Sequence, residues 1–226
     1  WTPESLRPAG HRVTLADMAG PANNRASSGG ESRMTRGGYG KDEIYTRMAW
    51  ASLKEWKALS KVSGLPIFMP HGVLFFTSKA DDYFTQSLAV NRALGIPIAE
   101  MNRAQLACRF PMIDFAGIEL GMFEPEFGAL MARRAVQMLV KRFVAAGGIY
   151  QQTAIAPPSL EDGTFTLRTD GGGAIEGDRF VFACGPWLPR LFPDLLGRRI
   201  FATRQEVFFF APPSGDRRFL PAGMPR

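Results

Sequence analysis

The stretch Arg12-Val13-Thr14-Leu15-Ala16-Asp17 is apolar or β-branched through its middle and ends in an acid. This pattern predicts a short strand, and Gly10 before it indicates the end of a preceding helix. In dinucleotide-binding folds, an acid at the end of the second strand accepts hydrogen bonds from the two hydroxyls of a ribose. Asp17 is therefore a candidate ribose-binding residue, although an acid that only caps a turn gives the same pattern.

Helices and strands alternate around this stretch. The apolar spacing of helices is found over residues 41–63, 81–94, 102–110 and 127–146, and a short helix begins at Gly185. Apolar and β-branched runs predict strands at residues 67–69, 73–76, 119–124, 149–155, 164–168, 179–183, 200–202 and 207–210. We expect the turn Pro70-His71-Gly72 to join the first two of these strands in a hairpin.

This order of elements predicts an α/β protein with two interleaved domains. A dinucleotide-type, Rossmann-like sheet domain is expected over residues 1–64 and 125–197. An α+β domain with an antiparallel sheet is expected over residues 65–124 and 198–226. The chain opens at Trp1 with no glycine-rich phosphate loop before residue 12, and it stops at Arg226 just after a run of expected strands. We therefore expect the chain to be truncated at both ends and both domains to be incomplete.

Composition and charge exclude several classes of protein. The 226 residues are 46% hydrophobic and 21% charged, as in a soluble chain with a core, and the apolar runs are far too short for a membrane helix. The net charge of +6 comes from scattered basic residues without interleaved aromatic residues, which argues against a nucleic-acid partner. The isolated cysteines and histidines predict no metal site, and the two cysteines fit a reducing compartment such as the cytoplasm. We also expect a monomer.

The segment Ala26-Ser27-Ser28-Gly29-Gly30-Glu31-Ser32-Arg33-Met34-Thr35-Arg36 is a second candidate for ligand binding. Its small residues would let the backbone approach a ligand closely, and its hydroxyls and amides suit phosphate oxygens. If the segment is helical, Arg33 and Arg36 share a face and form a positive pocket for a carboxylate. A solvated glycine- and serine-rich loop has the same composition.

The third candidate is Phe180-Val181-Phe182-Ala183-Cys184-Gly185-Pro186-Trp187. An apolar strand that breaks at glycine just before a helix brings the backbone close to a ligand at the carboxyl end of the strand. A buried strand with a tight exit turn is the alternative interpretation. We expect Cys184 to be a small buried residue without special reactivity.

These three segments, in this order, resemble flavoproteins of the D-amino-acid-oxidase superfamily, in the branch of monomeric sarcosine oxidase and N-methyltryptophan oxidase. In the part that would bind the cofactor, residues 10–17 match the ribose-binding strand, residues 27–36 the loop of small residues with two arginines, and residues 183–187 the second flavin-contacting turn. In the substrate domain, residues 72–76 match the first hairpin, and residues 204–207 match a strand that crosses near the substrate. The resemblance implies an FAD-binding domain interleaved with a substrate domain. It also implies an FAD-dependent oxidoreductase that oxidises the C–N bond of a secondary amine or N-methyl amino acid and passes a hydride equivalent to FAD.

The resemblance implies a role for each matching residue. Arg36 would pair with the carboxylate of a small-molecule substrate and orient it over the flavin, and Arg33 would lie close to the flavin ring. The residues that would bind FAD are Asp17, Ser27, Ser28, Ser32, Arg33, Ile155, Gly185 and Trp187.

The sequence departs from the family pattern at three places. Ser28 and Gly29 stand where some relatives have a histidine, and Thr203 stands where sarcosine oxidase has a tyrosine that helps to bind the substrate carboxylate. Residues 211–218 hold no lysine where that oxidase has the lysine that activates dioxygen, although Arg217 could supply a positive charge. Three alternatives therefore stay open: a flavin-binding protein without turnover, an amine dehydrogenase with an acceptor other than oxygen, and a nicotinamide dehydrogenase.

Overall fold

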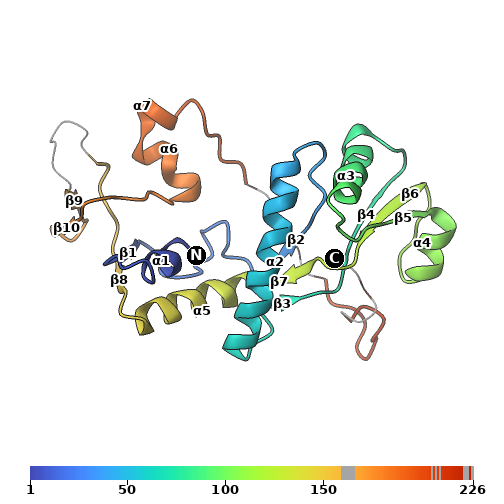
Figure 1. Cartoon of the computed structure of the whole chain (residues 1–226), viewed down its shortest axis with the longest axis horizontal. Helices are drawn as coiled ribbons and strands as arrows, with labels where there is room; N and C mark the ends of the chain where they lie inside the picture. Colours follow the sequence, from blue (N-terminus) through green and yellow to red (C-terminus); the bar gives the residue numbers. More distant parts are fainter. Residues whose placement is uncertain (159–165, 205, 207, 209, 221–223, 225–226) are drawn as a thin grey trace. The chain divides into compact units, whose positions relative to one another are not determined.

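The computed structural model describes residues 1–158, 166–204, 206, 208, 210–220 and 224 of the chain. The chain divides into two compact units (Figure 1). Unit 1 comprises Trp1–Glu31 and Ala132–Phe208, and unit 2 comprises Ser32–Met131 and Phe209–Arg226. The assignment of residue ranges to a cofactor domain and a substrate domain stays a prediction.

Unit 1 contains a parallel pair of strands. β1 (Thr14–Asp17) runs beside β8 (Ile149–Gln152), and Asp17 lies opposite Gln152 at the end of the ladder. β9 (Thr166–Arg168) and β10 (Ala174–Glu176) form a separate antiparallel pair. The helices of this unit are α1 (Thr2–Leu6), α5 (Ala132–Ala145), the 3₁₀ helix η1 (Gly185–Trp187), α6 (Leu188–Leu191) and α7 (Pro193–Leu196).

Unit 2 contains two antiparallel three-stranded sheets. Their strand orders are β2-β7-β3 and β4-β6-β5. The strands are β2 (Arg33–Thr35), β3 (Phe68–Met69), β4 (Val73–Thr77), β5 (Ala99–Asn102), β6 (Leu120–Glu124) and β7 (Gly128–Leu130). The helices are α2 (Glu43–Ser63), α3 (Asp82–Ala93) and α4 (Arg103–Arg109). In Figure 1, α3 and α4 lie beside the sheet of β4, β5 and β6.

Most of the buried apolar side chains belong to unit 2. One cluster packs between α2 and the strands on either side of the Pro70-His71-Gly72 turn, and comprises Leu53, Phe68, Val73, Ile96 and Phe127. A second surrounds α4, and comprises Met101, Leu106, Phe110, Phe115 and Phe123. A third joins α3 to β6, and comprises Phe84, Leu88 and Met122. These clusters hold the two sheets and three helices together as one unit.

Local capping signals place the starts of two helices where the sequence predicts them. The side chain of Asp81 accepts a hydrogen bond from the Phe84 amide at 2.8 Å, which begins α3. Asn102 accepts from the Gln105 amide at 3.0 Å, and the Gln105 side chain in turn accepts from the Asn102 amide at 2.8 Å. This reciprocal pair is a capping box and begins α4.

The predicted hairpin around Pro70-His71-Gly72 is wrong. β3 pairs with β7, whereas β4 pairs with β6, so the chain passes from one sheet to the other instead of folding back on itself. The reason is the contact that Gly72 makes: its amide donates to the carbonyl oxygen of Phe127 at 3.0 Å, which directs the chain into the second sheet.

The predicted helix over residues 127–146 begins later, because Gly128–Leu130 forms β7. β2 and β3 both pair with this segment, and the absence of a side chain at Gly128 lets the Met69 carbonyl approach closely. Pairing with two strands therefore overrides the helical spacing of the apolar residues. β2, β5 and β10 also form where the sequence predicts no strand.

Two predicted strands do not form. Residues 179–183 pair with no strand in the part of the chain that the structure describes, and Phe182 instead packs edge-on against Phe192 with ring centroids 4.9 Å apart. Residues 200–202 follow directly on α7, since the Arg199 and Ile200 amides still donate to the Leu196 carbonyl. Parts of two further predictions, at residues 164–165 and at residues 207 and 209, lie outside the described residues.

The parallel and antiparallel sheets with their helices confirm the predicted mixed α/β class. None of the helices in the described part of the chain is both long and apolar enough to span a membrane.

Replacement of Gly72 by alanine tests the passage between the two sheets. Gly72 has a φ of +79°, and an added Cβ would lie 2.2 Å from the Phe123 ring. We expect Gly72→Ala to lower the free energy of unfolding by roughly 2–5 kcal/mol, measured by urea denaturation. Gly64, with a φ of +65° and nothing within 4 Å of the added Cβ, is the matched control. Gly64→Ala should cost only about 1 kcal/mol, and equal costs at the two positions would contradict the packing argument.

Candidate functional site

The arginine-containing segment is a strand followed by a turn. β2 pairs with β7 from Arg33 to Thr35, and Arg36 follows the strand directly. The helical arrangement considered for Arg33 and Arg36 is therefore wrong, because ladder pairing with β7 extends the backbone here. Arg33 is half-buried and donates to the Ser32 carbonyl at 3.0 Å.

Residues 36–40, here called the Arg36 turn, are held by side chains from three elements of unit 2. From α2, Thr46 donates to the Gly37 carbonyl at 2.7 Å. From α3, Asn91 donates to the same carbonyl at 3.2 Å, and Ser87 accepts from the Gly40 amide at 2.8 Å. From the end of β6, Glu124 Oε2 accepts from the Gly37 amide at 2.9 Å. The backbone beside Arg36 is therefore fixed by buried polar groups.

The Arg36 turn is packed too tightly for side chains at its glycines. A Cβ at Gly37 would lie 2.6 Å from Asn91 Oδ1 and 2.8 Å from the Phe127 ring. A Cβ at Gly38 would lie 3.1 Å from Met122 Cε and 3.4 Å from Glu124 Oε1. The glycines thus allow the backbone to approach the Glu124 carboxyl closely.

Arg36 itself lies at the wall of an open hollow in unit 2. Its guanidinium carbon lies 4.9 Å from the centroid of the Tyr39 ring, within cation–π distance. Its Nε is buried, and within the described part of the chain it makes no hydrogen bond. The hollow has a volume of about 330 Å³ and is lined by Met34, Thr35, Arg36, Tyr39, Tyr45, Met48, Ala49 and Ser52.

Glu124 is the ionisable side chain beneath this turn. It is 0% exposed. Burial raises its pKa to about 7, while the Gly37 and Gly38 amides and the Arg36 charge act in the opposite direction. Among the residues that the structure describes, Glu124 Oε1 has no hydrogen-bond partner. The site therefore holds a buried carboxyl group that titrates near neutral pH beside an arginine.

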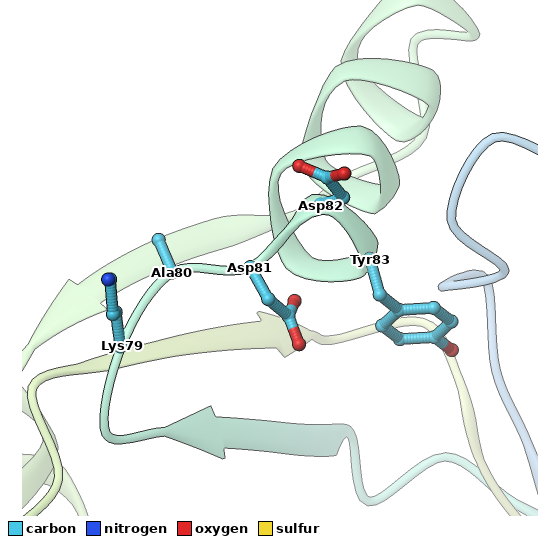
Figure 2. Close-up of a pocket in the computed structure, with 5 residues that line it drawn as sticks. All are labelled: Lys79, Ala80, Asp81, Asp82 and Tyr83. Carbon is cyan, nitrogen blue, oxygen red and sulfur yellow. The ribbon is translucent and has the colours of Figure 1, made fainter.

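Tyr83 connects the Arg36 turn to the start of α3. Its hydroxyl donates to the Gly38 carbonyl at 2.6 Å. Burial raises the pKa of this hydroxyl, and the nearby Arg36 charge lowers it. Figure 2 shows the Tyr83 ring extending from the first turn of α3 away from Lys79. The residues labelled there line a second open hollow of about 520 Å³, in which Asp81 and Asp82 are the acids.

In unit 1, Asp17 lies at the carboxyl end of β1. Its Oδ1 accepts from the Ala19 amide at 2.9 Å, and its carbonyl accepts from the Thr153 amide at 3.1 Å. Burial first, and the Asp17 charge second, raise the pKa of both the Tyr150 hydroxyl and the Cys184 thiol. Asp17 therefore lies near Cys184, in the segment that leads into η1.

The other predicted site residues are divided between the two units. Ser27 and Ser28 are exposed in a turn, which the Ala26 and Gly29 amides close by donating to the carbonyls of Asn23 and Ala26. Ile155 follows β8 and forms a bridge with Thr169. Gly185 and Trp187 belong to η1, whereas Ser32, Arg33 and Arg36 belong to unit 2. That these residues bind one cofactor stays a prediction.

Sequence reasoning missed the residues that hold the Arg36 turn. Glu124 is an acid directly after an apolar strand and before Phe127, which is a signal of a buried carboxyl group. Tyr39, Tyr83, Ser87 and Asn91 give no comparable signal, because their role depends on contacts between distant segments. No three of the His, Cys, Asp and Glu side chains gather as metal ligands in the described residues.

Comparison with known proteins identifies relatives over almost the whole chain. Residues 5–225 match the family described as FAD dependent oxidoreductase. The chain is 26% identical over 202 residues to N-methyl-L-tryptophan oxidase of Yersinia pestis (strain Pestoides F), and the match covers 87% of this chain and 54% of that protein. The chain thus spans about half the length of the curated relatives it matches.

Solved structures share the fold. The amino acid oxidase NikD of nikkomycin biosynthesis superposes with a TM-score of 0.69 and 20% identity over 83% of this chain and 48% of NikD. L-proline dehydrogenase from P. horikoshii gives a TM-score of 0.68 and 19% identity over 82% of this chain and 49% of the dehydrogenase. These likenesses confirm the predicted fold class.

The buried carboxyl of Glu124 predicts a dependence of stability on pH. Its pKa is about 7 in the folded protein and 4.5 ordinarily, so the folded state holds a proton that the unfolded state loses. The free energy of unfolding should therefore fall by on the order of 3 kcal/mol as the pH rises from 4.5 to about 7. Urea denaturation across this range should show a smaller fall for Glu124→Gln. Equal slopes for the two proteins would show that Glu124 titrates normally.

Proposed function

Because the chain belongs to the family of FAD-dependent oxidoreductases, we propose that the whole protein oxidises the C–N bond of a secondary amine or N-methyl amino acid. Family membership confirms FAD as the cofactor predicted from the sequence, and it favours the flavin over the nicotinamide hypothesis. The relatives named N-methyl-L-tryptophan oxidase support the substrate class.

The observation that carries this proposal is the position of Arg36. Arg36 lines an open hollow of unit 2. A bidentate pair between its guanidinium and a carboxylate in this hollow would orient the amine-bearing carbon of an amino acid. The rings of Tyr39 and Tyr45 in the same hollow would contact the apolar part of the substrate.

The residues near Asp17 fit the ribose of FAD. One carboxylate oxygen of Asp17 accepts from the Ala19 amide, which leaves acceptor capacity for ribose hydroxyls. The nearby Tyr150 hydroxyl is buried and has no partner among the described residues, so a ligand hydroxyl would satisfy it. When bound, FAD supplies the acceptor for the electron pair of the C–N oxidation. The chain supplies binding and orientation.

The electron acceptor that reoxidises the flavin separates two forms of this proposal. Residues 211–218 contain no lysine, and the resemblance to sarcosine oxidase places an oxygen-activating lysine there. A dehydrogenase with an acceptor other than oxygen is therefore the second candidate. That the protein works as a monomer in the cytoplasm stays a prediction from the sequence.

Anaerobic mixing of the whole, flavin-loaded protein with sarcosine or N-methyl-L-tryptophan tests the proposal. We expect the oxidised flavin absorbance to bleach with at least one of these amines. Readmission of air separates the two forms, since an oxidase regains its absorbance quickly and a dehydrogenase slowly. A flavin that stays oxidised with both amines would contradict the proposed reaction.

Arg36→Ala tests the role of the guanidinium. A charge-assisted pair contributes about 1.5–3 kcal/mol, so the variant should bind the amino acid roughly 10- to 150-fold more weakly while it retains flavin. Arg47→Ala is the matched control, because Arg47 is exposed on α2 and pairs with Glu43 only at the surface, at 2.6 Å. Unchanged affinity in Arg36→Ala would remove the role assigned to Arg36.

A further inference from the structure

The Glu124 carboxyl touches the backbone of the residue that follows Arg36. Oε2 accepts from the Gly37 amide at 2.9 Å. The carboxyl is fully buried, and a Cβ added at Gly38 would lie 3.4 Å from its Oε1, so the backbone of the Arg36 turn lies close to both carboxyl oxygens. Any change in the charge or position of this carboxyl is therefore transmitted to the backbone that carries the guanidinium.

Arg36 is also the cation that acts on Glu124. The Arg36 charge lowers the pKa of the Glu124 carboxyl against the larger effect of burial. The other groups of this cluster are Tyr39 from the turn and Tyr83 and Asp81 from the start of α3. Arg36 is the one cation in this set, so an ionised Glu124 and a substrate carboxylate would compete for electrostatic attraction to it.

We propose that Glu124 is a positioning residue for the carboxylate site at Arg36. Its hydrogen bond with the Gly37 amide fixes the backbone that places Arg36 at the hollow. Ionisation of Glu124 weakens the attraction between the Arg36 guanidinium and a substrate carboxylate. This inference rests on the proposed function, because it takes Arg36 as the group that binds the substrate carboxylate. Glu124 is fully buried and is not among the residues that line the hollow, so it acts through Gly37 and Arg36.

The two carboxylates are coupled, and the coupling sets the direction of the pH dependence. Below about pH 7, Glu124 is protonated, and Arg36 is free to attract the substrate carboxylate. As the pH rises above this value, Glu124 becomes negative and the affinity for the substrate falls. By reciprocity, a bound carboxylate raises the pKa of Glu124. A substrate without a carboxylate does not experience this coupling.

The test compares the whole, flavin-loaded protein with Glu124→Gln, which keeps a hydrogen-bond acceptor for Gly37 and removes the charge. KM and kcat for flavin reduction by sarcosine or N-methyl-L-tryptophan are measured between about pH 6 and pH 8. N-methyltryptamine, the decarboxylated form of the second substrate, serves as the probe that lacks a carboxylate. Glu126→Gln is the control variant, because the Glu126 side chain is 43% exposed and pairs with Lys57 at 3.0 Å.

We expect KM of the parent protein and of Glu126→Gln to rise roughly fivefold across this range, with kcat little changed. In Glu124→Gln the KM should stay at the low-pH value, and KM for N-methyltryptamine should not show the rise in any variant. The same rise in Glu124→Gln, or with N-methyltryptamine, would overturn the inference.

Two further outcomes are informative. If neither amino acid reduces the flavin in any variant, the proposed function fails, and the inference fails with it. If Glu124→Gln loses the flavin spectrum, Glu124→Asp becomes the second variant. Aspartate keeps the charge but retracts it from Gly37, so KM should rise at every pH. An unchanged KM in Glu124→Asp would overturn the positioning role.

Discussion

The hydrogen bond from the Gly37 amide to the buried Glu124 carboxyl is the contact on which the arrangement of unit 2 depends. Gly37 follows β2 of one sheet, and Glu124 ends β6 of the other, so this bond links the two sheets directly. Thr46 from α2 and Asn91 from α3 converge on the carbonyl of the same glycine. The two sheets, α2 and α3 therefore meet at the residue beside Arg36.

Burial of a carboxyl group is unfavourable, and the structure offsets it only in part. The Gly37 and Gly38 amides and the Arg36 charge favour the ionised form, yet the pKa of Glu124 stays at about 7. At neutral pH the carboxyl group is therefore populated in both its protonated and its ionised form. The desolvated charge that lowers stability at neutral pH also interacts with Arg36, the cation proposed to bind substrate. Stability and substrate affinity thus depend on a single titrating group.

Sequence reasoning succeeded where the signal is local. Asp81 and Asn102 begin helices through hydrogen bonds to residues three positions later, and such spacing is visible in one chain. It failed at Gly128–Leu130, where pairing with β2 and β3 overrides helical spacing. Of the candidate site, Asp17, Arg33 and Arg36 could be named from motifs. Glu124 was missed: the apolar run before it is a local signal, but its role depends on Gly37, which lies 87 residues away, and local periodicity carries no information about such contacts.

A crystal structure of the whole, flavin-loaded protein with a bound N-methyl amino acid would test the central claim most directly. The account predicts that the ligand carboxylate pairs with the Arg36 guanidinium while the Gly37 amide still donates to Glu124. A carboxylate held by other groups, with Arg36 turned toward solvent or paired with Glu124 alone, would contradict it.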